Sequence, residues 1–248
     1  MLRNIKLTIE YDGTDFYGWQ TQIKSQRTVQ AEIEKALKKI FKKQVTLFGS
    51  GRTDSGVHAL GQVANFRAAT KLPVATLQKA LNANLPKDIA IINVAEADPK
   101  FHARYSAQSK TYRYTILNRP ARGAIDRGFC LFYPYPLNVS LMRAEAKALV
   151  GRHNFKSFQA VDSSKTEKNA VRTVKRLVIK KKDARITIDI EANGFLYKMV
   201  RNIVGTLLAI GSGKLSKGSA RKILKGKDRA AAAPTAKPQG LTLVEVKY

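Results

Sequence analysis

The sequence predicts an α+β fold, in which strands and helices pack around shared cores. Three observations support this prediction. Several short segments alternate apolar and polar residues, as half-buried strands do. Other segments repeat apolar residues at helical spacing, so that one face of each helix is apolar. Strand-like and helix-like segments follow the same order in both halves of the chain.

The first half begins with a strand over 3–11, where apolar and polar residues alternate. A helix is expected over 29–43, since its apolar residues fall on one face and Thr28 is suited to cap its start. Pro73 can open a second helix through 81. Further strands are expected over 45–48, 62–66 and 89–94. The resulting order, β-α-β-β-α-β, is ferredoxin-like.

The second half repeats this order. Strands are expected over 110–117, 171–179, 185–191 and 241–246, and helices over 139–150, 195–210 and 217–225. Two similar halves suggest that their mostly antiparallel sheets join and leave a central cleft. A boundary near residue 105 gives an N-terminal domain over 1–105 and a C-terminal domain over 106–248.

The chain is strongly basic, with 45 Lys and Arg against 18 Asp and Glu and a net charge of +27. Such a chain attracts polyanions, and nucleic acid is the commonest one. Two alternatives are a membrane surface and lysines that only keep the protein in solution. No apolar run approaches the roughly 20 residues that a spanning helix needs. With no export signal and with Cys130 as the single cysteine, the cytoplasm is the expected location.

The glycine-rich segment 49–59 concentrates reactive side chains. Arg52 and Asp54 are two residues apart, so in an extended stretch both project to one face, and the arginine favours the ionised carboxylate of a nucleophile. The segment lacks the lysine of a phosphate-binding loop, the several carboxylates of a calcium loop and the third glycine of a dinucleotide fingerprint. A glycine-rich hairpin with a local Arg–Asp pair remains an alternative.

Seven motifs occur in register along the chain, at residues 11–20, 51–59, 80–86, 101–107, 110–114, 194–202 and 240–241. On these motifs the whole chain resembles the TruA family of tRNA pseudouridine synthases, most closely at Gly-Arg-Thr-Asp-Ser-Gly-Val-His-Ala over 51–59. It departs from the family pattern at Ala31, at Asn154 and near Ala232 and Ala233, which affects only local loops.

The resemblance implies an isomerase that converts uridine to pseudouridine at positions 38, 39 and 40 of the tRNA anticodon stem-loop. It further implies a homodimer that uses no cofactor and no metal, with the cleft as the RNA-binding surface. Asp54 would be the nucleophile, attacking either the base or the sugar. Arg52 would fill the space of the extruded base or hold a flanking phosphate. Tyr112 would stack on that base or take its C5 proton.

Two further residues are predicted to bind substrate: Arg201, as a partner of the Asp54 carboxylate, and His58. Each role has a structural alternative, in which Tyr112 packs in a core and Arg201 is a solvated helix charge. A zinc site of His58, His102 and His153 is disfavoured by their spacing.

The aromatic residues Phe16, Tyr17 and Trp19 could stack on RNA or anchor a loop. The alternative functions are a non-catalytic basic RNA-binding protein and a ribosomal or architectural protein. Neither predicts dependence on one carboxylate.

Overall fold

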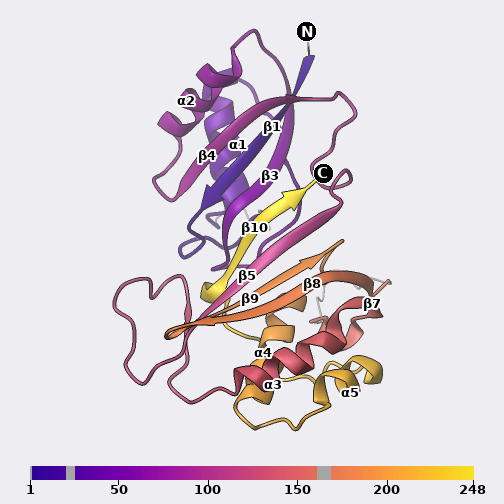
Figure 1. Ribbon diagram of the computed structural model, residues 1–248. Coiled ribbons are helices and arrows are strands. Elements are labelled where there is room, and N and C mark those ends of the chain that lie inside the picture. The colour runs from indigo at the N-terminus through magenta and orange to yellow at the C-terminus, as the bar shows by residue number, and fades with distance from the viewer. Residues whose placement is uncertain (1, 21–25, 161–168) are drawn as a thin grey trace. The chain divides into compact units, whose positions relative to one another are not determined.

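The computed structural model describes residues 2–20, 26–160 and 169–248. The chain forms two compact units. Unit 1 comprises Met1–Gln108 and Thr242–Tyr248, and unit 2 comprises Ser109–Leu241 (Figure 1). Within the described part of the chain, no helix has the length and apolar character needed to cross a membrane.

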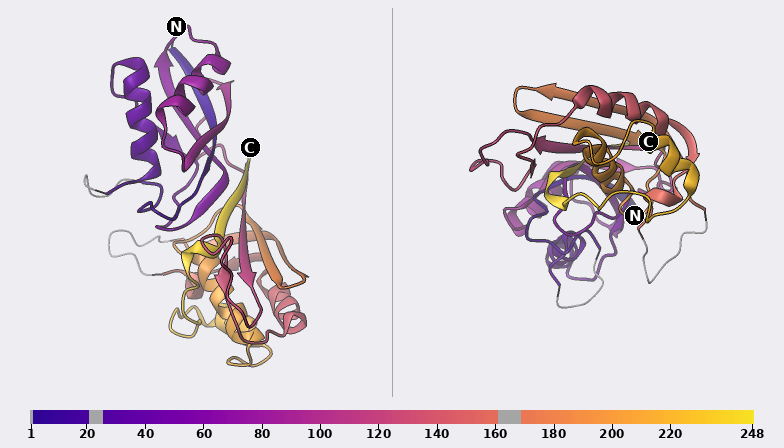
Figure 2. Two further views of the ribbon diagram at one scale, coloured as in Figure 1. Left: turned by 90° about the vertical axis from the view of Figure 1, so that its left-hand side faces the viewer. Right: turned by 90° about the horizontal axis from the view of Figure 1, so that it is seen from below.

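Unit 1 is a sheet with two helices on one of its faces (Figure 2). Strand β1 lies between β4 and β3 and is antiparallel to both. Two further strands pair with β3, the two-residue β2 in antiparallel and β10 in parallel orientation. Alternate residues of β1 (Ile5, Leu7 and Ile9) are fully buried and form part of the core. The elements are β1 (Leu2–Tyr11), α1 (Val29–Phe41), β2 (Phe48–Gly49), β3 (His58–Ala69), α2 (Val74–Asn84), β4 (Ile89–Ala97) and β10 (Leu241–Lys247).

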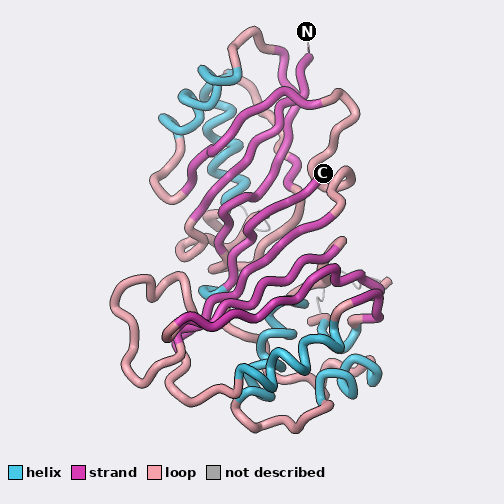
Figure 3. The backbone as a smooth tube through the Cα atoms, in the orientation of Figure 1, coloured by secondary structure: helices cyan, strands magenta, loops and turns pink. Residues whose placement is uncertain are grey.

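Unit 2 is a sheet in the order β5-β9-β8-β7, antiparallel throughout, with β6 added in parallel to β5. Its helices α3, α4 and α5 lie on one side of that sheet (Figure 3). Helix α4 is buried along most of its length. The elements are β5 (Ser109–Leu117), β6 (Leu131–Phe132), α3 (Val139–Ala146), β7 (Gly151–Asn154), β8 (Val171–Lys182), β9 (Arg185–Ala192), α4 (Met199–Gly211) and α5 (Ser219–Gly226), with 3-10 turns at Lys147–Leu149, Lys156–Phe158 and Pro238–Gly240.

The predicted α+β fold is confirmed, and so is the β-α-β-β-α-β order of the first half. The strand predicted over 45–48 is wrong except at Phe48. The backbone of Leu47 bonds to helix α1 and not to a strand: its N–H donates to Glu34 (3.0 Å) and its carbonyl accepts from Gln30 (3.1 Å). Side chains of a neighbouring helix have thus replaced the strand's hydrogen bonds.

The long helix predicted over 195–210 begins four residues late, at Met199. Lys198 has a left-handed backbone with φ of 55°, which a continuous α-helix excludes. A turn over 196–199 therefore precedes the helix, closed by the Met199 N–H donating to the Leu196 carbonyl at 3.0 Å.

The two units differ from the expected domains at the C-terminal end of the chain. The first segment of unit 1 ends at Gln108, near the expected boundary at 105, but Thr242–Tyr248 belongs to unit 1 as well. The last strand pairs with β3 there, with Thr242 opposite His58 and Leu243 opposite Ala59. The joining of the two sheets around a cleft stays a prediction.

Candidate functional site

The loop between β2 and β3 carries Arg52 and Asp54, and the segment after β1 holds it in place. The backbone N–H of Trp19 donates to the backbone carbonyl of Thr53 at 3.1 Å. The Phe16 carbonyl accepts from the Gly56 N–H at 3.3 Å and from the Ser55 hydroxyl at 3.1 Å. Two motifs that are far apart in the sequence therefore form one structure in unit 1.

Glycines make this close approach possible. A Cβ atom on Gly13 would lie 2.0 Å from the Val57 carbonyl oxygen, and one on Gly18 would lie 2.5 Å from that of Thr53. Gly18 also has φ of +89°, which side chains disfavour. Both positions thus require glycine for the two segments to pack.

Hydrogen bonds of buried polar side chains also hold the loop in place. The Ser50 hydroxyl donates to Gln62 Oε1 at 2.6 Å, and Gln62 Nε2 donates to the Gly51 carbonyl at 2.9 Å. The hydroxyls of Tyr11 and Thr53 are 2.8 Å apart. Burial raises the pKa of the Tyr11 hydroxyl, although hydrogen bonds with Thr53 and Gln62 act in the opposite direction, so this hydroxyl stays protonated. The role of Gln62 in holding this loop was not predicted from the sequence. The available signal was a polar side chain in a strand whose other residues are mostly apolar.

Asp54 lies at a tight turn of this loop. Its backbone carbonyl accepts the Val57 N–H at 3.2 Å, and Gly56 in between has φ of 74°. The Asp54 side chain is half-buried and that of Arg52 is exposed. The loop is thus held by neighbouring groups and carries a half-buried carboxylate close in sequence to an exposed guanidinium, an arrangement suited to a preorganised catalytic carboxylate.

His58 is 2% exposed and joins the two segments. Its Nδ1 accepts the Gly13 N–H at 2.9 Å and lies 3.1 Å from Asp12 Oδ1. Burial acts to raise the pKa of Asp12, but hydrogen bonds from the Thr14 hydroxyl and the Thr14 backbone N–H outweigh it and hold that pKa below its ordinary value. The contacts of His58 are those of a positioning residue, and its predicted role in binding substrate stays a prediction.

The three aromatic residues of the 11–20 segment divide between the two roles considered for them. Phe16 and Trp19 are 1% and 3% exposed. The prediction that they stack on RNA is therefore wrong, and they anchor the loop instead. Tyr17 is 58% exposed. The Arg27 guanidinium lies 4.1 Å from the Phe16 ring centroid and pairs with Asp88 at 2.7 Å. Arg27 therefore contacts the buried Phe16 ring of the segment and links it to Asp88.

Tyr112 and Arg201 both belong to unit 2. Tyr112 lies on β5, is 8% exposed, and meets the Phe195 ring edge-on at a centroid distance of 5.1 Å. Arg201 lies on α4, and its Nε donates to the Ala236 carbonyl at 2.8 Å. Burial raises the pKa of the neighbouring Tyr114, and the charge of Arg201 acts against that rise. Arg201 is therefore held in place, while its pairing with Asp54 stays a prediction.

The imagined three-histidine zinc site has no geometric support. The Nδ1 of His102 accepts the Arg104 N–H at 3.1 Å, and the Nε2 of His153 is 2.9 Å from the Val150 carbonyl. Across the described residues, no group of three His, Cys, Asp or Glu is placed to hold a metal ion.

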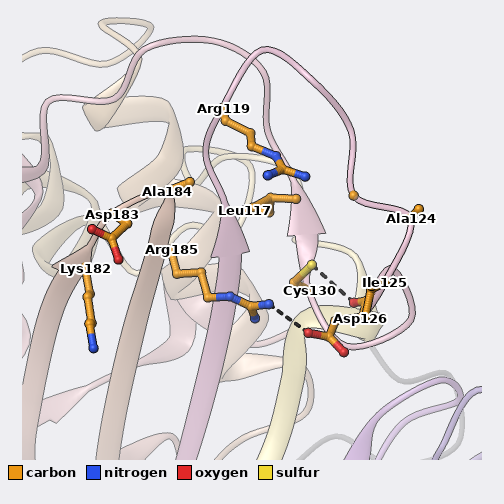
Figure 4. Close-up of a pocket in the computed structure, with 11 residues that line it drawn as sticks. Leu117, Arg119, Ala124, Ile125, Asp126, Cys130, Lys182, Asp183, Ala184 and Arg185 are labelled. Atoms are coloured by element: carbon orange, nitrogen blue, oxygen red, sulfur yellow. Dashed lines mark hydrogen bonds and ion pairs between the residues drawn. The ribbon is translucent and has the colours of Figure 1, made fainter.

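A cavity of about 680 Å³ lies in unit 2 between the segment after β5 and the β8–β9 turn (Figure 4). Arg185 pairs with Asp126 at 2.7 Å, and the Cys130 thiol donates to the Asp126 carbonyl at 3.3 Å. Burial raises the pKa of the Cys130 thiol, so the reactive thiolate is disfavoured. None of the predicted site residues lines this cavity.

Comparison with known proteins places these loops in context. A family model described as "tRNA pseudouridine synthase" matches residues 7–106 and 146–248. Proteins named "tRNA pseudouridine synthase A" are similar over the whole chain. The protein from Thermoanaerobacter sp. (strain X514) is 49% identical and that from Caldicellulosiruptor bescii 46%, each over 247 residues that cover 100% of both chains.

Among solved structures, one titled "Crystal Structure of a Cbf5-Nop10-Gar1 Complex" is 11% identical, with a TM-score of 0.36, over 96% of this chain and 57% of that chain.

Proposed function

The chain belongs to the tRNA pseudouridine synthase family, and from this premise we propose that it isomerises uridine to pseudouridine in tRNA with Asp54 as the nucleophile. One observation carries the proposal. The Arg52–Asp54 turn is fixed by the 11–20 segment and by buried polar groups, and it carries a half-buried carboxylate two residues from an exposed guanidinium. An enzyme that stabilises a transition state needs such a preorganised group, whereas a module that only binds RNA does not.

The reaction is a rearrangement that conserves atoms. The bond between N1 of uracil and the sugar C1′ breaks, the base turns, and C5 forms a new bond to C1′. C5 loses its proton and N1 gains one, so no oxidant, reductant or second substrate is required. The Asp54 carboxylate attacks either the base or the sugar and forms a covalent intermediate. The bond to Asp54 breaks again before the product leaves, which restores the carboxylate, so the reaction is split into separate steps.

The target base must leave its stack before it can reach Asp54, at a cost of about a few kcal/mol. The exposed Arg52 guanidinium is suited to occupy the vacated space or to hold a flanking phosphate. The Tyr112 ring is suited to contact the extruded base, and its hydroxyl to take the C5 proton. Arg201 would pair with Asp54, and His58 would contact the substrate or set the loop position.

We assign the anticodon stem-loop as the target, with uridines at positions 38, 39 and 40. The acting form is a homodimer in the cytoplasm, and the two units act as an N-terminal domain with the Asp54 loop and a C-terminal domain with Tyr112. No metal or cofactor takes part. This assignment rests on family membership and on the motifs that the chain carries.

Mapping of pseudouridine in tRNA, by chemical probing before and after incubation with the protein, tests the proposal. New pseudouridine at positions 38–40 is expected. New pseudouridine elsewhere would overturn the assigned target. A protein that binds the tRNA but leaves every uridine unchanged would instead support the alternative of a non-catalytic basic RNA-binding protein.

Affinity for tRNA is expected to fall steeply with salt. The net charge of +27 predicts many phosphate contacts, and each one releases a counterion on binding, which steepens the slope of log K against log salt concentration. Filter binding between about 50 and 200 mM salt measures that slope, and a loss of roughly 10³-fold or more is expected for six or more contacts. A flat response would contradict a broad phosphate-contacting surface.

Tyr112→Phe is expected to reduce turnover far more than binding. The ring keeps its edge-on contact with Phe195, so stacking survives, but the hydroxyl that would accept the C5 proton is lost. Loss of an acid–base group typically costs 10²- to 10⁴-fold in rate. Single-turnover pseudouridine formation and filter binding separate the two effects. Unchanged turnover would assign proton removal to another group.

A further inference from the structure

A second cluster of aromatic side chains lies outside the proposed catalytic machinery, on the surface of unit 1. The rings of Phe48 and His102 are 5.2 Å apart between centroids, and those of His102 and Tyr105 are 4.4 Å apart. The Arg104 guanidinium lies 5.8 Å from the Tyr105 centroid. We call these four residues the aromatic platform. Tyr105 is 77% exposed and Phe48 is 42% exposed, although both rings are apolar and would ordinarily be covered.

The platform is built on a rigid support. The loop after β4, which carries His102, Arg104 and Tyr105, is bonded to two buried asparagines. Asn4 Nδ2 donates to the Asp98 and Phe101 carbonyls at 2.8 and 2.9 Å, and Asn65 Oδ1 accepts the Ala103 N–H at 2.9 Å. Asn4 and Asn65 are 4% and 2% exposed, so these bonds are shielded from water.

The loop also closes on itself. The Ser106 hydroxyl accepts the His102 N–H at 3.1 Å, and the His102 carbonyl accepts the Ser106 N–H at 2.9 Å. A ligand that stacks on the exposed rings therefore meets side chains whose backbone is already ordered, which lowers the entropy lost on binding.

The platform is continuous with the Asp54 loop. Phe48 is one of the two residues of β2, and the loop with Asp54 follows that strand directly. Tyr248 contacts both the loop after β4 and the Asp54 loop. Its hydroxyl donates to the Ala103 carbonyl at 2.8 Å and also lies next to the Ser50 hydroxyl. A substrate held by Asp54 would therefore have its neighbouring nucleotides near the platform.

We propose that an unpaired nucleotide of the RNA substrate, close in sequence to the modified uridine, stacks on Tyr105 and His102. This inference rests on the proposed function. Stacking on exposed aromatic rings is how proteins bind single-stranded bases, whereas paired bases hide their faces in the helix. The adjacent Arg104 and Lys100 are both exposed and supply positive charge for the phosphates of that nucleotide.

Tyr105→Ala tests the platform. Loss of one base–aromatic stack is expected to weaken tRNA binding by roughly 5- to 150-fold. Tyr105→Phe should keep wild-type affinity because the ring remains, and Tyr105→Leu should behave like Tyr105→Ala because an aliphatic chain cannot stack. Tyr135→Ala is the matched control, since that tyrosine is 66% exposed but belongs to unit 2 and lies outside the platform. Tyr135→Ala should bind as the wild type does.

The kinetic readout separates stacking from a structural effect. Tyr105→Ala should raise KM by the same factor while turnover at saturating tRNA stays within about twofold, because stacking is made before and during the reaction alike. The slope of affinity against salt should be unchanged, since no charge is removed. Wild-type affinity in Tyr105→Ala, or an equal loss in Tyr105→Phe, would overturn the platform.

This failure differs from failure of the proposed function. If the platform is wrong but the function is right, wild-type protein still forms pseudouridine and Tyr105→Ala binds tRNA normally. If the function is wrong, wild-type protein forms no pseudouridine. Binding then still tests the platform: Tyr105→Ala either weakens RNA binding, which supports it, or leaves binding unchanged, which overturns it.

Discussion

Asp54→Asn is expected to lower pseudouridine formation on the order of 10⁴-fold or more, the range seen when an enzyme loses a group of its nucleophilic machinery. Asparagine nearly preserves the shape of the side chain but carries no negative charge and no nucleophilic oxygen. Asp54 is the one carboxylate in the 49–59 segment, so no neighbouring acid in that loop can replace it.

The variant should remain folded. The hydrogen bonds that fix the loop come from backbone groups of Phe16, Trp19 and Thr53 and from the buried side chains of Ser50 and Gln62. Affinity for tRNA should hold or rise, because a negative charge near the phosphates is removed. Release of tritium from uracil-labelled tRNA, beside a filter-binding titration, measures both quantities.

Two results would count against this role of Asp54. Near-normal tritium release by folded Asp54→Asn would show that the carboxylate is not the nucleophile. An equal loss of release and of binding would show that Asp54 shapes the loop and takes no part in the chemistry.

Elements set by local patterns could be predicted from the sequence. Helix α1 follows from its apolar face and from Thr28, whose side chain accepts the Ala31 N–H at 3.4 Å as an N-cap. Strand β1 follows from alternation, and its inward residues belong to the buried core of unit 1. In such segments the local preference and the tertiary packing agree, so the pattern suffices.

Features set by partners far away in the sequence could not be predicted. The sequence at 45–48 has strand character, but Gln30 and Glu34 of a helix take the backbone bonds of Leu47. The last strand was itself predicted, but its pairing with β3 was not, because Thr242 lies opposite His58, 184 residues earlier in the chain. Neither partner leaves a signal in the segment itself.

The candidate site shows the same contrast. Its charged residues were visible as one dense motif, because Arg52, Asp54 and His58 are neighbours in sequence. Their support was not visible, because it depends on the Trp19 N–H reaching the Thr53 carbonyl and on the Gly13 backbone reaching His58. Chemistry could therefore be inferred from local residue types, whereas the positioning of that chemistry required the fold.

That positioning leads to a second large effect: Gly13→Ala is expected to lower turnover by roughly 100-fold, the scale of a misplacement of about 1 Å. The added methyl group would lie 2.0 Å from the Val57 carbonyl oxygen, so the two segments must separate. Separation would also break the bond from the Gly13 N–H to His58 Nδ1, at 2.9 Å in the native fold. The clash should cost about 1–3 kcal/mol of stability, as overpacking does.

Gly226→Ala is the control, because a Cβ atom there meets nothing within 4 Å and the residue ends helix α5. Its thermal midpoint and turnover should match or slightly exceed those of the wild type, since alanine favours a helix. Single-turnover pseudouridine formation and thermal unfolding, measured on both variants below their midpoints, separate misplaced chemistry from unfolding. Wild-type turnover in Gly13→Ala would mean that the 11–20 segment does not hold the Asp54 loop in its active geometry. Normal tRNA binding with lost turnover would instead show that this contact between two distant motifs serves catalysis.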